Sequence, residues 1–209
     1  MENVLVAGAT GNTGRLVIEL LNKSQYFTPV AMVRKSKQKA DFERIGVQTV
    51  LGDLQKDVSH TLKDIDKVVF AAGSGGEKVE KVDQEGAKKM IDESKAHNIK
   101  RFVMLSSMGA DNPEQMQELQ DYLKAKKNAD DYLRSSELIF TIVRPGSLTN
   151  DEPKGHIDIS EKLNRQGEIS RADVAQVLTR CLHDTAPKNI TFEILEGETL
   201  ISKALEGMQ

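Results

Sequence analysis

Gly8-Ala9-Thr10-Gly11-Asn12-Thr13-Gly14 is the most informative segment of this sequence. An apolar run at residues 3–7 precedes it, as in a short buried strand, and a helical pattern opens at Arg15 directly after it. Three glycines in GxxGxxG spacing between a strand and a helix are typical of a dinucleotide-binding turn. The first glycine would let the chain turn sharply, the second would let the backbone approach a pyrophosphate, and the third would let the helix pack closely. A plain flexible turn is the alternative interpretation. The candidate cofactor contacts in the segment are Gly8, Thr10, Gly11, Asn12, Thr13 and Gly14.

Apolar strand patterns alternate with helical patterns along the rest of the chain. Strands are predicted at residues 3–7, 29–33, 47–51, 67–71, 101–105, 139–143 and 191–195. Helices or helical turns are predicted at residues 15–21, 35–45, 58–62, 79–91, 116–133 and 170–182. The first six strands, separated by helices, predict a doubly wound α/β fold with a parallel sheet covered on both faces. Its ligand is expected at the carboxyl ends of the strands, near the switch in strand order.

The chain is predicted to form a single domain over residues 1–209. Residues 147–169 are polar and turn-rich, which indicates a loop or small lobe over the substrate site. Ser170 is predicted to cap the following helix, with the acidic Asp173 in its first turn. The apolar residues of the tail are expected to pack on the domain.

Composition excludes several classes of function. The formal net charge of −3 argues against nucleic acid as the main partner. Cys181 is the single cysteine, so an intrachain disulfide is impossible and a reducing compartment fits. The four histidines are scattered without metal-ligand spacing, so no metal site is expected. No signal segment and no apolar run of roughly 20 residues is found, which predicts a soluble, cytoplasmic protein without a membrane partner.

Tyr122 and Lys126 are the strongest candidates for catalysis. They are four residues apart on a predicted helix, which places both on one face, and Leu119 and Leu133 on that side indicate that the face points inward. A tyrosine with a pKa of about 10 is a poor acid-base group near neutrality. A lysine ammonium about 5 Å away, at an effective dielectric near 20, offers the phenolate roughly 3 kcal/mol, or about two pKa units. The alternative is a packed tyrosine beside a solvated lysine.

Ser106 and Ser107 end the strand before that helix. A serine hydroxyl there can hydrogen-bond a substrate carbonyl or a developing alkoxide beside the tyrosine. Serines also cap helices and turns, which is the structural alternative for both.

Arg34 ends the second predicted strand, 20 residues after Gly14. An acidic residue near this position binds the ribose 2′-hydroxyl of NAD, whereas an arginine accommodates the 2′-phosphate of NADP. Lys35 and Lys37 follow it. The sequence therefore favours NADP, unless these cations form only a solvated basic turn.

Two further strand ends carry candidate cofactor contacts. Asp53, followed by Leu54, ends the third strand, and the aspartate is suited to accept from an adenine amino group; a turn residue is the alternative. Ala71, Ala72 and Gly73 end the fourth strand and are small, as a backbone lying against a cofactor requires. A plain loop would tolerate the same residues.

Taken together, the motifs resemble those of the atypical short-chain dehydrogenase/reductases, in the NmrA-like and biliverdin-reductase-B-like branch. The matching segments are Gly8 to Gly14, Gly52-Asp53-Leu54, Leu105-Ser106-Ser107, Tyr122-x-x-x-Lys126 and Val143-Arg144-Pro145-Gly146. The resemblance covers nearly the whole chain and implies a Rossmann fold with a bound nicotinamide cofactor. It implies that Tyr122 is the general acid-base and that Lys126 holds the nicotinamide ribose. It also implies that Ser107 steadies the substrate oxygen, with Ser106 as second choice, and that Ser106 and Pro145 lie at the cofactor.

Two departures from the family pattern bear on function. Extended members carry an asparagine where this chain has Asp83, so the asparagine's role is not transferred. The chain also lacks the long C-terminal domain of the sugar-nucleotide epimerases, which favours a small carbonyl, quinone or flavin-like acceptor. The expected function is an NADPH-dependent oxidoreductase acting on a small molecule as a monomer or homodimer. The alternatives are a non-catalytic NADP-binding regulator of the NmrA type and an epimerase or dehydratase.

Overall fold

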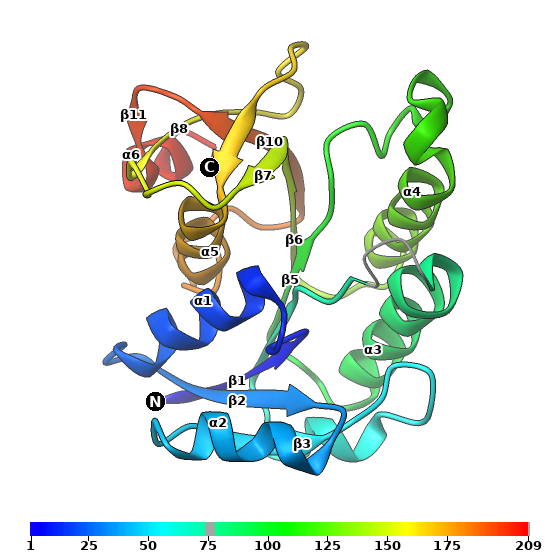
Figure 1. The fold of residues 1–209 in the computed structure, drawn as a ribbon, viewed down its shortest axis with the longest axis vertical. Helices are drawn as coiled ribbons and strands as arrows, with labels where there is room; N and C mark the ends of the chain where they lie inside the picture. Colours follow the sequence, from blue (N-terminus) through cyan, green and yellow to red (C-terminus); the bar gives the residue numbers. More distant parts are fainter. Residues whose placement is uncertain (74–77, 209) are drawn as a thin grey trace.

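A mostly parallel sheet forms the centre of the molecule (Figure 1). The computed structural model describes residues 1–73 and 78–208. Within these residues the main sheet has nine strands in the order β11-β8-β10-β6-β5-β4-β1-β2-β3. The strands are β1 Glu2–Ala7, β2 Phe27–Val33, β3 Gln48–Leu51, β4 Lys67–Phe70, β5 Arg101–Leu105, β6 Phe140–Pro145, β8 His156–Ser160, β10 Ile190–Glu196 and β11 Thr199–Leu200.

The predicted doubly wound sheet is confirmed. β1 pairs in parallel with β2 and β4, and parallel pairing continues to β3 on one side and through β5 and β6 to β10 on the other. The chain runs outward from β1 to β3 and then returns to the opposite side of β1 to form β4. This reversal creates a switch point between the carboxyl ends of β1 and β4, where ligands bind in such sheets.

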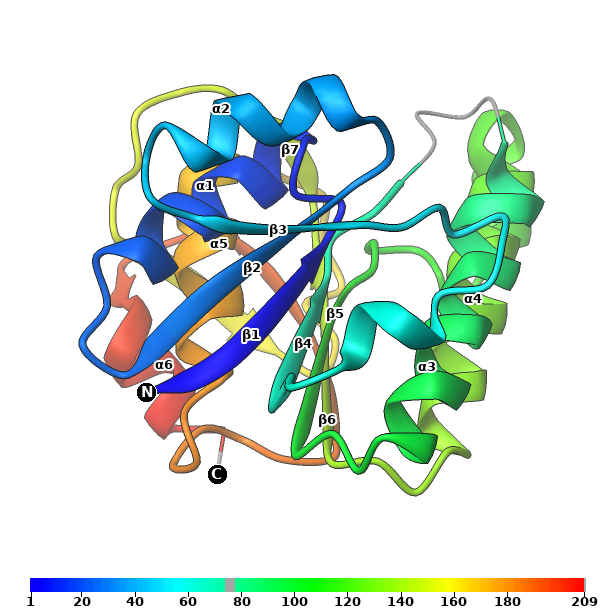
Figure 2. The ribbon, with the colours of Figure 1, turned by 90° about the horizontal axis from the view of Figure 1, so that it is seen from below.

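Helices cover both faces of the sheet, with α1 and α5 on one side and α3 and α4 on the other (Figure 2). The helices are α1 Asn12–Asn22, α2 Lys39–Glu43, α3 Glu85–Ala96, α4 Gln120–Arg134, α5 Arg171–Arg180 and α6 Ile201–Glu206. The strands are apolar at successive positions because both of their faces are buried. In β1, Val4 and Val6 join the core beneath α1 and α5, whereas Leu5 and Ala7 join the core beneath α3 and α4.

Residues 147–169, predicted to form a loop or small lobe over the substrate site, contain short strands. β7, Ser147–Thr149, pairs in parallel with β9, Glu168–Ser170, and β8 extends the main sheet by antiparallel pairing with β10. β8 alternates apolar and polar residues and lies among polar neighbours, so its sequence pattern is difficult to recognise as a strand. A short strand of this kind gains its stability from the sheet that it joins rather than from its own sequence.

Two predicted helices differ from the expectation in the winding of their N-terminal turns. Residues 79–91 form a π-helix, Val79–Gln84, followed by α3, and the wider winding turns Asp83 inward to 1% exposure. Residues 113–119 form two 3₁₀ turns before α4. Leu119, expected on the buried face, is 45% exposed, so it does not mark the core side of this helix.

The predicted cap of α5 is confirmed. The Ser170 hydroxyl accepts a hydrogen bond from the backbone N–H of Asp173 at 3.0 Å. The tail also packs as expected, because α6 buries Ile201, Ala204 and Leu205. Among the described residues, no helix combines the length and the apolar character needed to cross a bilayer.

Candidate functional site

A cleft of about 390 Å³ lies at the switch point between β1 and β4. Its volume falls in the range of about 300–1,000 Å³ that small-molecule and cofactor sites occupy. Four segments that follow strands β1 to β4 contribute to its walls. The lining residues are Gly8, Thr10, Gly11, Met32, Arg34, Gly52, Asp53, Leu54, Ala71, Ala72, Gly73, Lys78 and Val82.

The glycine turn has the geometry that a nucleotide cradle requires. Gly8 adopts φ of +90°, and a Cβ there would lie 2.6 Å from the backbone of Ala71. A Cβ at Gly14 would overlap the Gly8 carbonyl oxygen. Gly14 is therefore needed for α1 to pack closely against the glycine turn. A Cβ at Gly11 would meet only Gly8, at 3.3 Å, and would otherwise project into open space at the cleft. The glycine turn therefore leaves room for a nucleotide pyrophosphate to approach the backbone at Gly11.

Helix α1 begins at Asn12, three residues earlier than predicted, immediately after Gly11. The first N–H groups of a helix have no intrahelical acceptors. Asn12, Thr13 and Gly14 occupy this first turn, beside the cleft. Together with the helix dipole, they offer positive potential to a phosphate.

Arg34 lines the cleft and makes no ion pair within residues 1–73 and 78–208. Its backbone N–H and that of Lys35 both donate to the Gln38 side-chain oxygen, at 3.1 and 2.9 Å. The turn after β2 is thus held by Gln38, which leaves the Arg34 guanidinium to an external anion. Asp53 also lines the cleft, and its carboxylate accepts from the backbone N–H of Gln55 at 3.0 Å.

Lys126 and Tyr122 lie on α4, next to the carboxyl end of β5. Lys126 is only 4% exposed, and its ammonium donates to the carbonyl of Leu105 at 3.3 Å. The same nitrogen lies 5.6 Å from the centre of the Tyr122 ring. Tyr122 is half-buried, so its side chain remains accessible beside the held ammonium.

Asp83 is a neighbour of Lys126 to which the sequence assigned no role. Its carboxylate lies 3.5 Å from the Lys126 ammonium, and both side chains are almost fully buried. The π-helix places it there, and a Cβ at Gly73 would lie 3.3 Å from the same carboxylate. Asp83 therefore compensates the buried charge of Lys126 at the edge of the cleft.

A second buried charge lies one helical turn further along α4, at Asp130. Its carboxylate accepts from the Ser106 hydroxyl at 2.9 Å and from Arg144 Nε and Nη2 at 2.9 and 2.8 Å. Burial raises the pKa of Asp130, and the opposing effects of Arg144 and Ser106 only offset part of that rise. The group ties together α4 and the ends of β5 and β6.

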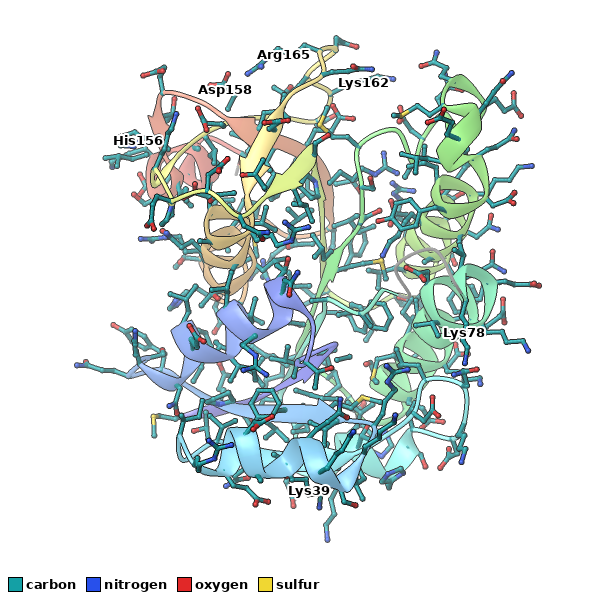
Figure 3. The ribbon with its side chains drawn as sticks, in the orientation of Figure 1. Lys39, Lys78, His156, Asp158, Lys162 and Arg165 are labelled. Carbon is teal, nitrogen blue, oxygen red and sulfur yellow. The ribbon has the colours of Figure 1, made fainter. Side chains whose placement is uncertain are left out.

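Arg144 also extends this network toward the surface. Its Nη1 lies 4.0 Å from Asp111, which pairs with the Lys162 ammonium at 2.7 Å. Burial alone would raise the pKa of Asp111, but Lys162 and Arg144 hold it below its usual value. Figure 3 shows Lys162 at the tip of the connection between β8 and β9. The C-terminal strands are thereby linked to the ends of β5 and β6.

Ser107 and Pro145 lie side by side at the ends of β5 and β6. The N–H of Met108 donates to the Pro145 carbonyl at 3.0 Å, and the Ser107 hydroxyl donates to the Met108 carbonyl at 3.1 Å. Ser107 must therefore rotate to donate to a substrate oxygen.

The structure brings most of the candidate residues to one edge of the sheet. Those that line the cleft are Gly8, Thr10, Gly11, Arg34, Asp53, Leu54, Ala71, Ala72 and Gly73. Those beside it, at the ends of β5 and β6 and on α4, are Ser106, Ser107, Tyr122, Lys126 and Pro145. Sequence reasoning missed Met32, Lys78 and Val82 in the cleft and Asp83, Asp130 and Arg144 behind the site. Arg144 stands within a matching family segment and Asp83 at a departure from the family pattern, and Asp130 lies four residues after Lys126 on the same helix face.

Comparisons with known proteins agree with this geometry. Residues 8–185 match the NAD(P)H-binding family. The Bacillus subtilis protein YhfK, named an uncharacterized sugar epimerase, is 37% identical over 97% of this chain and 98% of its own. A Bacillus halodurans structure, named as a candidate NAD-dependent epimerase/dehydratase, is 41% identical with a TM-score of 0.94, covering 99% of this chain and 100% of that one. The structure of the oxidoreductase ylbE from Lactococcus lactis is 28% identical with a TM-score of 0.88, covering 99% and 96%.

Proposed function

Because the chain belongs to the NAD(P)H-binding family, among the atypical short-chain dehydrogenase/reductases, we propose that it is an NADPH-dependent oxidoreductase. Its acceptor is a small carbonyl, quinone or flavin-like molecule. The observation that carries this proposal is the placement of Lys126. The ammonium is buried, held by the Leu105 carbonyl and Asp83, and lies beside the Tyr122 ring at the cofactor edge of the sheet.

Some of the site residues act on the acceptor and others hold the cofactor. When bound, the nicotinamide supplies the hydride. Tyr122 donates the proton that balances this hydride at the acceptor oxygen, and Lys126 stabilises the phenolate left behind. Ser107 turns its hydroxyl to the acceptor oxygen as negative charge develops there. Gly11 and the first turn of α1 hold the pyrophosphate, while Arg34 holds the adenosine end.

The surroundings of Tyr122 favour a small apolar acceptor. Met116 and Leu119 precede α4 and are 39% and 45% exposed, so they present apolar surface near its first turn. The chain after β6 completes the same sheet with β10, β8 and β11. This arrangement suits a planar or short acceptor better than a large nucleotide sugar.

An epimerase or dehydratase is the second candidate, and the names of two of the compared proteins favour it. Such an enzyme removes and returns a hydride with no net use of cofactor. A non-catalytic NADP-dependent regulator is the third, and the Tyr122–Lys126 arrangement counts against it.

Turnover measurements separate these functions. The purified protein is first titrated with NADPH and NADH, and NADPH oxidation is then followed with a panel of carbonyls, quinones and flavins. We expect net oxidation of NADPH by at least one acceptor. Interconversion of nucleotide sugars without net oxidation would favour the epimerase. Tight binding with no turnover on either panel would contradict catalysis and favour the regulator.

A further inference from the structure

Asp130 is a buried carboxylate that the proposed reaction does not use. It is 0% exposed and lies on α4 at the position four residues after Lys126 and eight after Tyr122. These three residues therefore form one stripe along the helix face that meets the ends of β5 and β6. Burying a charge is costly unless it is paired and hydrogen-bonded, so its surroundings should explain why it is there.

The hydrogen bonds to Asp130 are all on one oxygen. Oδ2 accepts from the Ser106 hydroxyl and from both Nε and Nη2 of Arg144. Oδ1 is buried and has no hydrogen-bond partner among the described residues. The Asp130 carboxylate therefore binds Ser106 and Arg144 through Oδ2 alone.

This arrangement fixes the role of the Ser106 hydroxyl. A carboxylate only accepts hydrogen bonds, so the single hydroxyl proton of Ser106 is committed to Asp130. The serine oxygen then has only lone pairs to offer to any other group. Ser106 is consequently an acceptor at this site and not a donor.

Ser106 is 3% exposed and lies at the strand end that adjoins the proposed cofactor site. It directly follows Leu105, whose carbonyl receives the Lys126 ammonium. It therefore lies just beyond β5, the neighbour of β4, and the small residues after β4 line the cleft. A nicotinamide nucleotide presents donors in its nicotinamide half, the carboxamide N–H groups and the ribose hydroxyls.

We propose that Asp130 is a positioning residue that holds the Ser106 hydroxyl as a hydrogen-bond acceptor for the nicotinamide half of the cofactor. The proposal rests on the proposed function through its cofactor and needs no acceptor substrate. Without Asp130, the Ser106 hydroxyl is free to rotate and Arg144 loses its buried counter-charge. Rotation of the Ser106 hydroxyl should weaken cofactor binding, whereas the loss of the counter-charge of Arg144 should lower the stability of the fold.

A double-mutant cycle separates these two effects. The dissociation constant of NADPH is measured for wild type, Ser106→Ala, Asp130→Ala and the double variant, and the melting temperature is measured alongside. Each single variant should bind NADPH about 2- to 12-fold more weakly, the factor that one neutral hydrogen bond contributes. Asp130→Ala should weaken binding no further in the Ser106→Ala background, although it should still lower the melting temperature.

Two controls test whether the effect is local. 2′,5′-ADP, which lacks the nicotinamide half, should bind all four proteins equally. Thr141→Val removes a buried hydroxyl that donates to Pro187 at 2.8 Å, elsewhere on β6. It should lower the melting temperature while leaving the affinity for NADPH unchanged.

Asp130→Asn provides a conservative variant, because its amide oxygen can take the place of Oδ2. It should keep NADPH affinity within about twofold of wild type despite a lower melting temperature, as an intact hydrogen bond predicts. The proposal is wrong if Asp130→Ala weakens binding equally in both serine backgrounds or if Asp130→Asn loses as much affinity as Asp130→Ala. Should Asp130→Ala fail to fold, wild-type affinity in Ser106→Ala is enough to overturn it. If the proposed function is wrong but this proposal is right, no acceptor will be reduced, and the NADPH dissociation constants of the four proteins will still show the expected pattern.

Discussion

Tyr122 is the residue on which the proposed chemistry depends most directly. Replacing it with phenylalanine deletes the proton donor and leaves the ring that Lys126 contacts, so fold and cofactor affinity should be preserved. General acid-base groups typically contribute 10²- to 10⁴-fold to the rate. We expect Tyr122→Phe to lower kcat by about that factor on any acceptor that the wild type reduces. Tyr132→Phe is a matched control, because Tyr132 lies on the same helix and bonds Asp92. Normal turnover in Tyr122→Phe would rule out this tyrosine as the acid.

Arg34 is expected to decide between the two nicotinamide cofactors. Its guanidinium faces the cleft without an internal ion pair among the described residues, so the 2′-phosphate of NADPH would be its partner. Hydrogen bonds to charged groups contribute about 1.5–3 kcal/mol, or roughly 10- to 150-fold in affinity. We expect NADPH to bind at least about tenfold more tightly than NADH and Arg34→Ala to remove most of this difference.

The control for Arg34 is Arg44→Ala, which removes the same charge from an exposed pair with Asp41. Its two dissociation constants should match those of wild type. Equal affinities in wild type would refute the preference. A preference that survives Arg34→Ala would transfer the role to Lys35 or Lys37, which follow on the same turn.

At the scale of elements, α5 joins the C-terminal strands to the core. The Ser170 hydroxyl caps its first turn, and the Asp173 carboxylate accepts from the backbone N–H groups of Lys154 and Gly155 at 3.0 and 2.8 Å. Loss of an N-cap serine costs about 0.5–2 kcal/mol. We expect Ser170→Ala to lower the free energy of unfolding in urea by about 1 kcal/mol.

The comparison for this variant is Ser135→Ala, at the exposed C-terminal end of α4. Surface substitutions of this kind usually change stability by less than about 0.5 kcal/mol. If both variants lose the same stability, the cap does not hold α5 in place.

At the scale of the whole molecule, the reactivity of the Cys181 thiol measures how often the protein unfolds. The thiol is fully buried beneath the sheet, and burial raises its pKa from an ordinary value of 9.0 to about 12. Thiolates react and thiols do not, so the native protein should resist a thiol reagent at pH 8 and react fully in urea. Bound NADPH should slow labelling at intermediate urea, since a ligand that binds only the native state stabilises it.

The same thiol predicts a pH dependence. Between the ordinary pKa of 9.0 and the folded value of about 12, the unfolded chain loses this proton and the folded chain keeps it. Stability should therefore decline as the pH rises through this window. Cys181→Ala, which gives no labelling signal, should show a smaller decline above pH 9. Rapid labelling of the native protein at pH 8 would contradict the burial of this cysteine.

The sequence by itself determined the parallel sheet and the nucleotide edge of the molecule. β1, β2, β4 and β5 are apolar at consecutive positions because both of their faces are covered, and such runs are visible without any tertiary information. The glycine turn was equally visible, since a φ of +90° at Gly8 and the close contact of Gly14 with the turn exclude side chains locally.

Tertiary structure alone decided the strands after β6 and the charges behind the site. β8 pairs with β10 only when β10 lies beside β6, because a strand takes its ladder hydrogen bonds from neighbours distant in sequence. The sequence assigned no partner to Asp83 or Asp130, and only the π-helix and the packing of α4 bring them to Lys126, Arg144 and Ser106. Pairing of buried charges depends on distances between separate elements, and no local pattern encodes those distances.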